Sequence, residues 1–144
     1  SVSGMQLAAA FNTIANGGEY IAPALIRGVA GPDGVMHPIA SGTRRQVLSA
    51  TTAATMRDML AGVVTQGTGT RAQVDGYSVA GKTGTAQNPH GDDHSWFSGY
   101  MEINKYPVIS LIVLVENGGK GSLEGAMISR KIFNFVIQNE IIQT

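Results

Sequence analysis

Residues 76–87 read GYSVAGKTGTAQ, and this stretch matches both a nucleotide-binding loop and a strand. Residues 76–83 fit G-x-x-x-x-G-K-[ST], the pattern of a phosphate-binding loop. That site needs a buried strand before the first glycine and a helix that begins at the lysine, so that backbone N–H groups surround the phosphates. The residues before Gly76 are instead polar and glycine-rich, and Pro89 follows soon after the lysine. The sequence therefore favours a strand over 77–87, and we predict that no nucleotide binds.

A strand over 77–87 would carry chemically useful groups on both of its faces. Alternation places Lys82 and Gly84 on one face and Thr83 and Thr85 on the other. Glycine inside a strand often marks the close approach of a ligand or another backbone. An ammonium, two hydroxyls and free N–H groups suit an extended, anionic, peptide-like ligand lying along the strand edge. The alternative is an edge strand on which Lys82 only deters aggregation, and these residues alone leave both interpretations open.

The rest of the chain predicts an α+β fold with an antiparallel sheet flanked by helices. A capping box, Ser3 with Gln6, begins the first helix. Three helices are expected, each from an apolar face at helical spacing. The first covers 3–15, with Leu7, Phe11 and Ile14 on its face, and the second covers 51–66, with Met56, Leu60, Val63 and Val64. The third covers 123–142, with Ile128, Ile132, Phe135 and Val136. The expected strands cover 21–29, 35–39, 77–87, 95–103 and 108–116, with a turn at 32–34 and a polar connection over 41–45. Short connections between the last three strands favour an antiparallel meander, with the terminal helix on one face.

Composition narrows the function classes. The chain has 144 residues, with 10 Lys+Arg against 10 Asp+Glu and no Cys. Zero net charge argues against a dedicated nucleic-acid-binding protein, and the lack of cysteine excludes disulfides and a thiol nucleophile. The longest apolar run, 108–115, is far shorter than the about 20 residues of a membrane-spanning helix. Charged residues make up 14%, where about 25% is usual, so we expect another part of a larger protein to cover much of this surface.

The predicted strand and four other segments resemble one known family. Residues 82–85, KTGT, resemble the KTG box of penicillin-binding protein transpeptidase domains. The similarity extends to a helix that ends in an ANGG turn, a V-x-x-G-T-G segment, the following strand and a Glu-Asn-Gly-Gly turn, at residues 5–18, 64–69, 95–100 and 115–119. The last two look most like elongation-type class B members. The resemblance implies the fold shared by serine β-lactamases and these transpeptidases.

The family's first two motifs are missing from this sequence. No Ser is followed by Lys three residues later, and Ser-x-Asn does not occur. In members of the family both motifs precede the KTG box, and the first carries the nucleophile. Residues 1–144 are therefore expected to be the C-terminal portion of a single transpeptidase domain, which needs the missing N-terminal portion as its partner.

The resemblance also implies an activity and roles for four residues. The implied enzyme is a peptidoglycan D,D-transpeptidase that cross-links stem peptides through a serine acyl-enzyme and is acylated by penicillin. Lys82 would attract the substrate and support proton transfer, and the Thr85 N–H would supply half of an oxyanion hole. The hydroxyls of Thr83 and Thr85 would bind the substrate carboxylate, and Gly84 would let the peptide backbone approach. Neither a metal nor another cofactor is expected, and the implied location is the outer face of the bacterial cytoplasmic membrane.

Other interpretations remain open. Class D β-lactamases and penicillin sensors also carry a KTG strand, and a non-catalytic binding module is a third possibility. Residues 90–94, HGDDH, include metal-ligand types, but Pro89 and Gly91 favour an ordinary polar loop. Trp96 could stack on a ligand, although it and Phe97 point to opposite faces, so at least one of the two should belong to the core.

Overall fold

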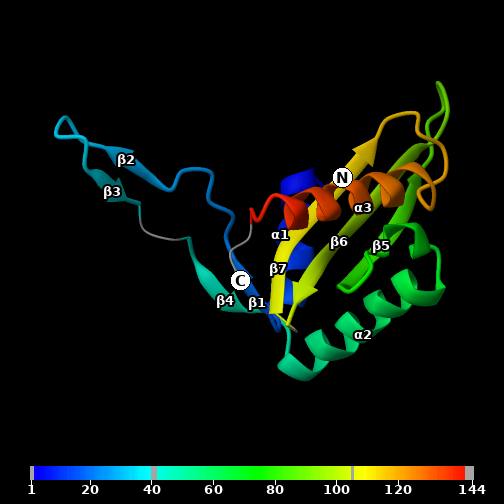
Figure 1. Ribbon diagram of the computed structural model, residues 1–144, viewed down its shortest axis with the longest axis horizontal. Coiled ribbons are helices and arrows are strands. Elements are labelled where there is room, and N and C mark those ends of the chain that lie inside the picture. The colour runs from blue at the N-terminus through cyan, green and yellow to red at the C-terminus, as the bar shows by residue number, and fades with distance from the viewer. Residues whose placement is uncertain (1, 40–41, 105, 142–144) are drawn as a thin grey trace.

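The computed structural model describes residues 2–39, 42–104 and 106–141 (Figure 1). The elements in chain order are α1 (Gly4–Ala15), β1 (Glu19–Ile21), β2 (Gly28–Ala30), β3 (Met36–Pro38), β4 (Arg44–Gln46), α2 (Ala50–Gln66), a 3-10 turn η1 (Thr70–Ala72), β5 (Ser78–Ala86), β6 (His94–Ile103), β7 (Tyr106–Val115) and α3 (Glu124–Gln138). This arrangement confirms the predicted α+β class and the strand over the KTGT sequence.

The main sheet has the order β5-β6-β7, with both pairs antiparallel, as the short connections predicted. Helix α3 lies on one face of this sheet and α1 on the other, while α2 packs along β5 (Figure 1). The α3 side holds the larger buried cluster, in which Phe97, Met101 and Phe133 are fully buried. The α1 side holds a smaller cluster around Tyr100, Ala80 and Leu60. Strand β5 is therefore held from both faces of the sheet.

Helix α1 begins and ends where the sequence predicted. The Ser3 side chain accepts a hydrogen bond from the Gln6 backbone, and the Gln6 side chain accepts one from the Ser3 backbone, which completes the capping box. After the cap residue Asn16, Gly17 and Gly18 take positive φ angles of 66° and 94°. Glycine adopts this left-handed backbone without steric cost, so the chain can turn directly into β1.

The prediction for the buried face of α3 was wrong in part. Phe135 is 58% exposed and Ile132 37% exposed, whereas Phe133 is fully buried. Small residues decide the orientation: a Cβ at Gly125 would lie 2.9 Å from the backbone carbon of Trp96. The helix can therefore lie close to β6 only through the face that contains Gly125, and this face also places Phe133 in the core. The expected end of the helix at residue 142 lies outside the described residues.

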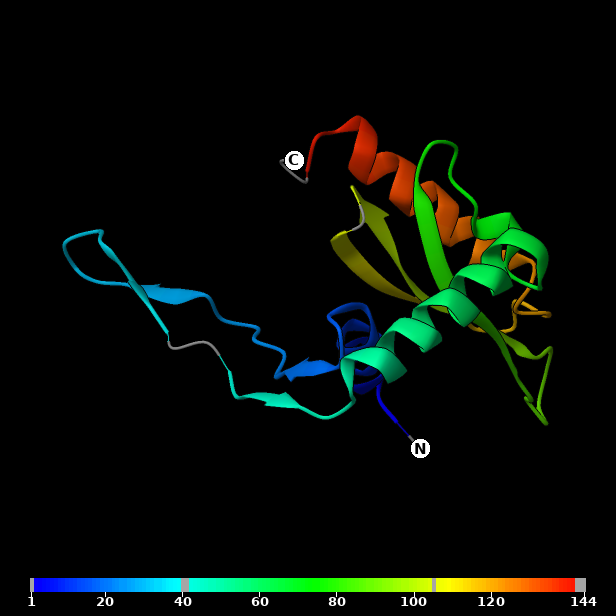
Figure 2. The same cartoon turned by 90° about the horizontal axis from the view of Figure 1, so that it is seen from below.

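The segment between α1 and α2 forms an extended arm, in which the predicted strand over 35–39 is confirmed as β3 and the predicted strand over 21–29 is replaced by the two short strands β1 and β2. Strand β1 pairs with β4, and β2 pairs with β3 (Figures 1 and 2). The prediction of one strand over 21–29 is wrong, because Pro23 has no backbone N–H to donate to a partner strand. The predicted turn at 32–34 is confirmed, with Gly34 at a φ of 75°. Strand β4 forms where a polar connection was expected.

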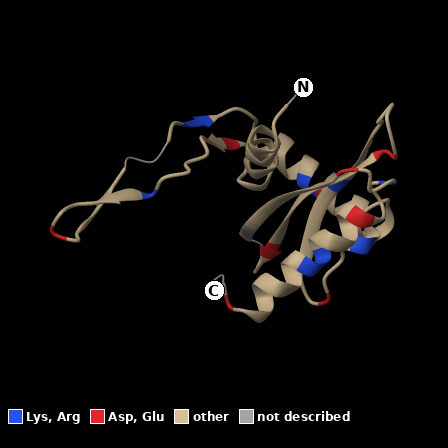
Figure 3. Cartoon of the chain, turned by 90° about the horizontal axis from the view of Figure 1, so that it is seen from above, with Lys and Arg blue, Asp and Glu red and all other residues tan. Residues whose placement is uncertain are grey.

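Charged residues of both signs are interspersed along the described chain (Figure 3). This distribution agrees with the net charge of zero. Among the described helices, none combines the length and apolar character required to cross a bilayer.

Candidate functional site

The candidate site lies along strand β5, where the KTGT sequence faces a free strand edge. Strand β5 pairs only with β6 among the described residues, so its other edge carries no strand. The register aligns Lys82 with Ser98 and Thr85 with Ser95. An unpaired edge presents backbone N–H and C=O groups to any extended chain that approaches. The edge predicted to bind a peptide-like ligand is therefore not paired with another strand among the described residues.

Lys82 is exposed and belongs to the face of the sheet that also carries Ala80. Its ammonium bends back and donates a hydrogen bond to the Thr83 carbonyl oxygen at 2.7 Å. The positive charge consequently lies against the strand instead of extending into solvent. An anion that approaches β5 would meet this ammonium beside the threonine backbone.

The Thr83 side chain is almost buried, with 7% of its surface exposed, on the opposite face from Lys82. Its hydroxyl lies 2.6 Å from the hydroxyl of Thr68, and either oxygen can be the donor. Thr68 belongs to the loop that follows α2. No role for Thr68 follows from the sequence, where it is only one residue of the 64–69 segment, because its contact with Thr83 depends on tertiary structure.

The Thr85 hydroxyl accepts a hydrogen bond from the Gly121 backbone N–H at 3.0 Å. A hydroxyl can accept this bond and still donate its own hydrogen, so Thr85 keeps a donor for a ligand. Gly121 also lies against Gly84, since a Cβ at Gly121 would overlap the Gly84 carbonyl oxygen. The loop between β7 and α3 therefore forms one border of the site, which the sequence analysis did not identify.

These groups can hold an anionic, extended ligand and stabilise a developing negative charge. The strand supplies the Lys82 ammonium on one face, the Thr83 and Thr85 hydroxyls on the other, and backbone N–H groups between them. Donors of this kind, fixed by the surrounding fold, are suited to an oxyanion. The geometry also disagrees with a phosphate-binding loop, because Lys82 lies inside a strand rather than at the start of a helix.

A polar cavity of about 310 Å³ lies between α2 and the β5–β6 pair. Arg57 donates to Glu102 at 2.8 Å on its wall. The Tyr100 hydroxyl is buried and has no hydrogen-bond partner within the part of the chain that the structure describes. Burial raises the pKa of Tyr100 to about 12, and the negative charge of Glu102 acts in the same direction. Tyr100 therefore remains a neutral phenol at physiological pH.

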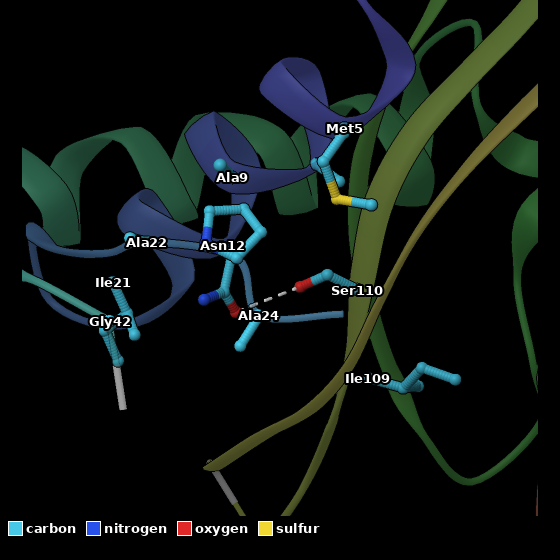
Figure 4. A pocket seen from close by; sticks show the side chains of 11 residues that line it. Met5, Ala9, Asn12, Ile21, Ala22, Ala24, Gly42, Ile109 and Ser110 are labelled. Atoms are coloured by element: carbon cyan, nitrogen blue, oxygen red, sulfur yellow. Dashed lines mark hydrogen bonds between the residues drawn. The ribbon is translucent and has the colours of Figure 1, made fainter. Parts of the chain in front are cut away.

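A second cavity, of about 500 Å³, lies between α1, the chain after β1, and β7 (Figure 4). Its described lining is mostly apolar and contains no titratable side chain. The Ser110 hydroxyl donates to the Asn12 side-chain oxygen at 3.4 Å across this cavity. These residues offer shape but no acid, base or charged group for chemistry.

Residues 90–93 lie in the connection between β5 and β6, as the loop interpretation predicted, and His94 is the first residue of β6. The His94 Nδ1 accepts a hydrogen bond from the Asn117 N–H, and the Asp93 carboxylate accepts one from the Asn88 N–H. No group of three or more metal-ligating side chains occurs among the described residues. Phe97 is buried in the core, which confirms the prediction that at least one of Trp96 and Phe97 belongs to it. Trp96 lines a groove on the opposite face with Met5 and Leu114.

Comparison with known proteins agrees with this geometry. The family described as "Penicillin binding protein transpeptidase domain" matches residues 1–138. Penicillin-binding protein PbpB of Mycolicibacterium smegmatis is 39% identical over 111 residues, which cover 68% of this chain and 17% of that protein. The peptidoglycan D,D-transpeptidase PbpA of the same organism is 34% identical over 116 residues, which cover 74% of this chain and 22% of that protein.

Solved structures give the same result. The D,D-transpeptidase domain of a peptidoglycan glycosyltransferase from Eggerthella lenta has a TM-score of 0.81 at 35% identity, covering 92% of this chain and 31% of that one. An imipenem acyl-enzyme complex of penicillin-binding protein A from M. tuberculosis has a TM-score of 0.78 at 30% identity, covering 95% of this chain and 31% of that one. The chain thus spans about a fifth of the curated relatives and about a third of the solved chains. On its fold and its sequence, the chain belongs to the penicillin-binding protein transpeptidase domain family.

Proposed function

We propose that residues 1–144 are the C-terminal portion of the transpeptidase domain of a class B penicillin-binding protein. The complete protein would be a peptidoglycan D,D-transpeptidase that cross-links stem peptides through a serine acyl-enzyme and is acylated by β-lactams. The observation that carries this proposal is the unpaired edge of β5, where the KTGT sequence brings together the Lys82 ammonium, the strand backbone and the Thr85 hydroxyl. The names of the relatives and the acyl-enzyme state of one structural neighbour support the same activity.

The chain's own residues would bind and polarise the substrate. The stem peptide would lie along the outer edge of β5, with its terminal carboxylate near Lys82 and the hydroxyls of Thr83 and Thr85. A serine from the preceding portion would attack the carbonyl of the scissile peptide bond and form an ester, while the terminal D-alanine leaves as an amine. The Thr85 N–H would donate to the oxyanion, and Gly84 would leave room for the substrate backbone. None of these steps requires a metal or a nucleotide.

The chain exposes more surface than a compact monomer of its mass, which supports the proposal that another portion of the domain covers part of it. The accessible surface is 9148 Å². A compact monomer of 15.0 kDa exposes about 7,000 Å². The apolar residues Trp96, Leu114 and Met5 also line an open groove on the α1 side of the sheet. We infer that the preceding portion of the domain covers this face and brings the nucleophile to Lys82.

The same proposal places the complete protein at the outer face of the bacterial cytoplasmic membrane, where peptidoglycan is built. A fluorescent penicillin tests the proposal in the complete protein. A denaturation-resistant label that is released very slowly supports a transpeptidase, whereas rapid turnover would favour a β-lactamase. Failure of the complete protein to form any adduct would leave only the binding-module interpretation.

A further inference from the structure

We propose that Thr68 is a positioning residue for Thr83, an inference that rests on the proposed function. The two hydroxyl oxygens lie 2.6 Å apart, which is a short distance for a bond between neutral hydroxyls. Thr68 is exposed, whereas Thr83 is almost buried. Thr68 lies just after the end of α2, and its hydroxyl contacts Thr83 near the middle of β5. The loop after α2 therefore supplies a hydroxyl to the strand that would bind the substrate.

The loop that carries Thr68 is fixed to the end of α2. The backbone N–H groups of Gly67 and Gly69 both donate to the Val63 carbonyl oxygen, at 3.1 and 2.9 Å. The Gln73 side chain donates to the carbonyl oxygen of Val64 at 2.8 Å. A Cβ at Gly67 would lie 2.9 Å from the Val63 carbonyl oxygen, so a larger residue would displace the turn. Thr68 is thus held in place before any ligand binds, as a positioning group must be.

The number of hydrogens in the pair explains what Thr68 can do. Each threonine hydroxyl has one hydrogen to donate and two lone pairs to accept with. If Thr83 donates to Thr68, Thr83 has no hydrogen left for a carboxylate. If Thr68 donates to Thr83, the hydrogen of Thr83 is free for the ligand. The direction of this one bond therefore decides whether Thr83 can bind an anion.

A substrate carboxylate would select the second arrangement, because an ionised carboxylate only accepts hydrogen bonds. The result is a chain in which Thr68 donates to Thr83 and Thr83 donates to the carboxylate. Consecutive hydrogen bonds polarise one another, so the bond to the charged ligand is strengthened. Thr68 would then contribute to recognition of the carboxylate without touching it.

The test measures acylation of the complete protein by a penicillin with its free carboxylate and by the methyl ester of the same compound. Replacing Thr68 by Val should slow acylation by the carboxylate form about 2- to 10-fold, the range for one neutral hydrogen bond, and leave the ester rate unchanged. Thr68→Ser should restore the wild-type rate, because serine keeps the hydroxyl. Thr70→Val is the matched control: Thr70 is exposed two residues away and takes part in no side-chain hydrogen bond among the described residues.

A double-mutant cycle separates positioning from direct contact. If Thr68 acts through Thr83, adding Thr68→Val to Thr83→Val should cause no further loss with the carboxylate ligand. Additive losses would overturn the positioning role, and so would equal slowing of both ligands or a wild-type rate for Thr68→Val. A Thr68→Ser protein as slow as Thr68→Val would also overturn it. Serine keeps the hydroxyl and disturbs the loop least, so its rate reports on the hydrogen bond rather than on the fold of the loop. Failure of the wild-type protein to be acylated by either ligand would instead overturn the proposed function, and this inference with it.

Discussion

The hydroxyl of Thr85 accepts a hydrogen bond from the backbone N–H of Gly121 at 3.0 Å, which ties the end of β5 to the loop before α3. The neighbouring Ser95 strengthens this connection, because its hydroxyl donates to the Lys120 carbonyl oxygen and accepts from the Gly125 N–H. The loop and the KTGT strand therefore form one connected unit. A ligand that binds Thr85 would meet a hydroxyl that already accepts one hydrogen bond and can still donate its own hydrogen.

The first prediction concerns Thr85 in the complete protein. Thr85→Val keeps the backbone N–H and the approximate shape but removes the hydroxyl. A hydrogen bond to a charged group contributes about 1.5–3 kcal/mol, so acylation by a carboxylate-bearing penicillin should slow about 10- to 150-fold. The ester analogue should be affected much less, and Thr85→Ser should stay near wild type. Equal slowing with both ligands would reduce Thr85 to a structural residue that only holds Gly121.

The second prediction tests the close contact between Gly121 and Gly84. Gly121→Ala would place a methyl group on the Gly84 carbonyl oxygen, so either the loop or the strand must move. We expect a lower melting temperature and slower acylation. Gly62→Ala is the matched control: it lies inside α2 with nothing near the added Cβ and should stabilise by about 0.5–1 kcal/mol. A Gly121→Ala protein as stable and active as wild type would show that this contact does not shape the site.

The sequence predicted the elements that local signals specify. The capping box at Ser3, the glycines that end α1 and the alternation along β5 all act over a few residues, and each prediction was confirmed. The KTGT sequence could be placed on a strand because the phosphate-loop alternative needed a helix at Lys82 that its neighbours do not support.

The contacts that complete the site could not be predicted in this way. Thr68 and Gly121 reach β5 from loops 15 and 36 residues distant from their partners. The arm was predicted only in part: β3 and the turn before it were expected, but β1 pairs with β4 across more than 20 residues, a contact that no local signal specifies. The roles assigned to Lys82, Thr83, Gly84 and Thr85 remain predictions, and substitutions of Lys82, Thr83 and Thr85 test three of them.

The third prediction uses the corrected orientation of α3. Phe133→Ala should destabilise the chain by about 3–5 kcal/mol, because it leaves a cavity in the core between α3 and the sheet. Phe135→Ala, two residues further along the same helix, should change the free energy of unfolding by about 0.5 kcal/mol or less, since that ring is 58% exposed. Urea unfolding of both variants provides the comparison. Equal losses would contradict the observed orientation of the helix.

The fourth prediction concerns alkaline pH. The pKa of Tyr100 is raised from 10.0 to about 12, so the folded state keeps this proton more tightly than the unfolded state. Its contribution to stability is complete below pH 10 and is lost as the pH rises from 10 through 12. The free energy of unfolding of wild type relative to Tyr100→Phe should fall by at most about 1.4 kcal/mol per pH unit in that range. A difference independent of pH between 9 and 12 would contradict the raised pKa.

Labelling with a fluorescent penicillin tests the central claim most directly. The complete protein should form one adduct that survives denaturation, and Lys82→Ala should greatly slow its formation, because the charge beside the strand is lost. The 144-residue chain alone should form none, because it lacks Ser-x-x-Lys and, on the proposed function, would supply only the binding half of the site. A stable label on the isolated chain, or a complete protein that labels equally fast without the Lys82 ammonium, would contradict the account.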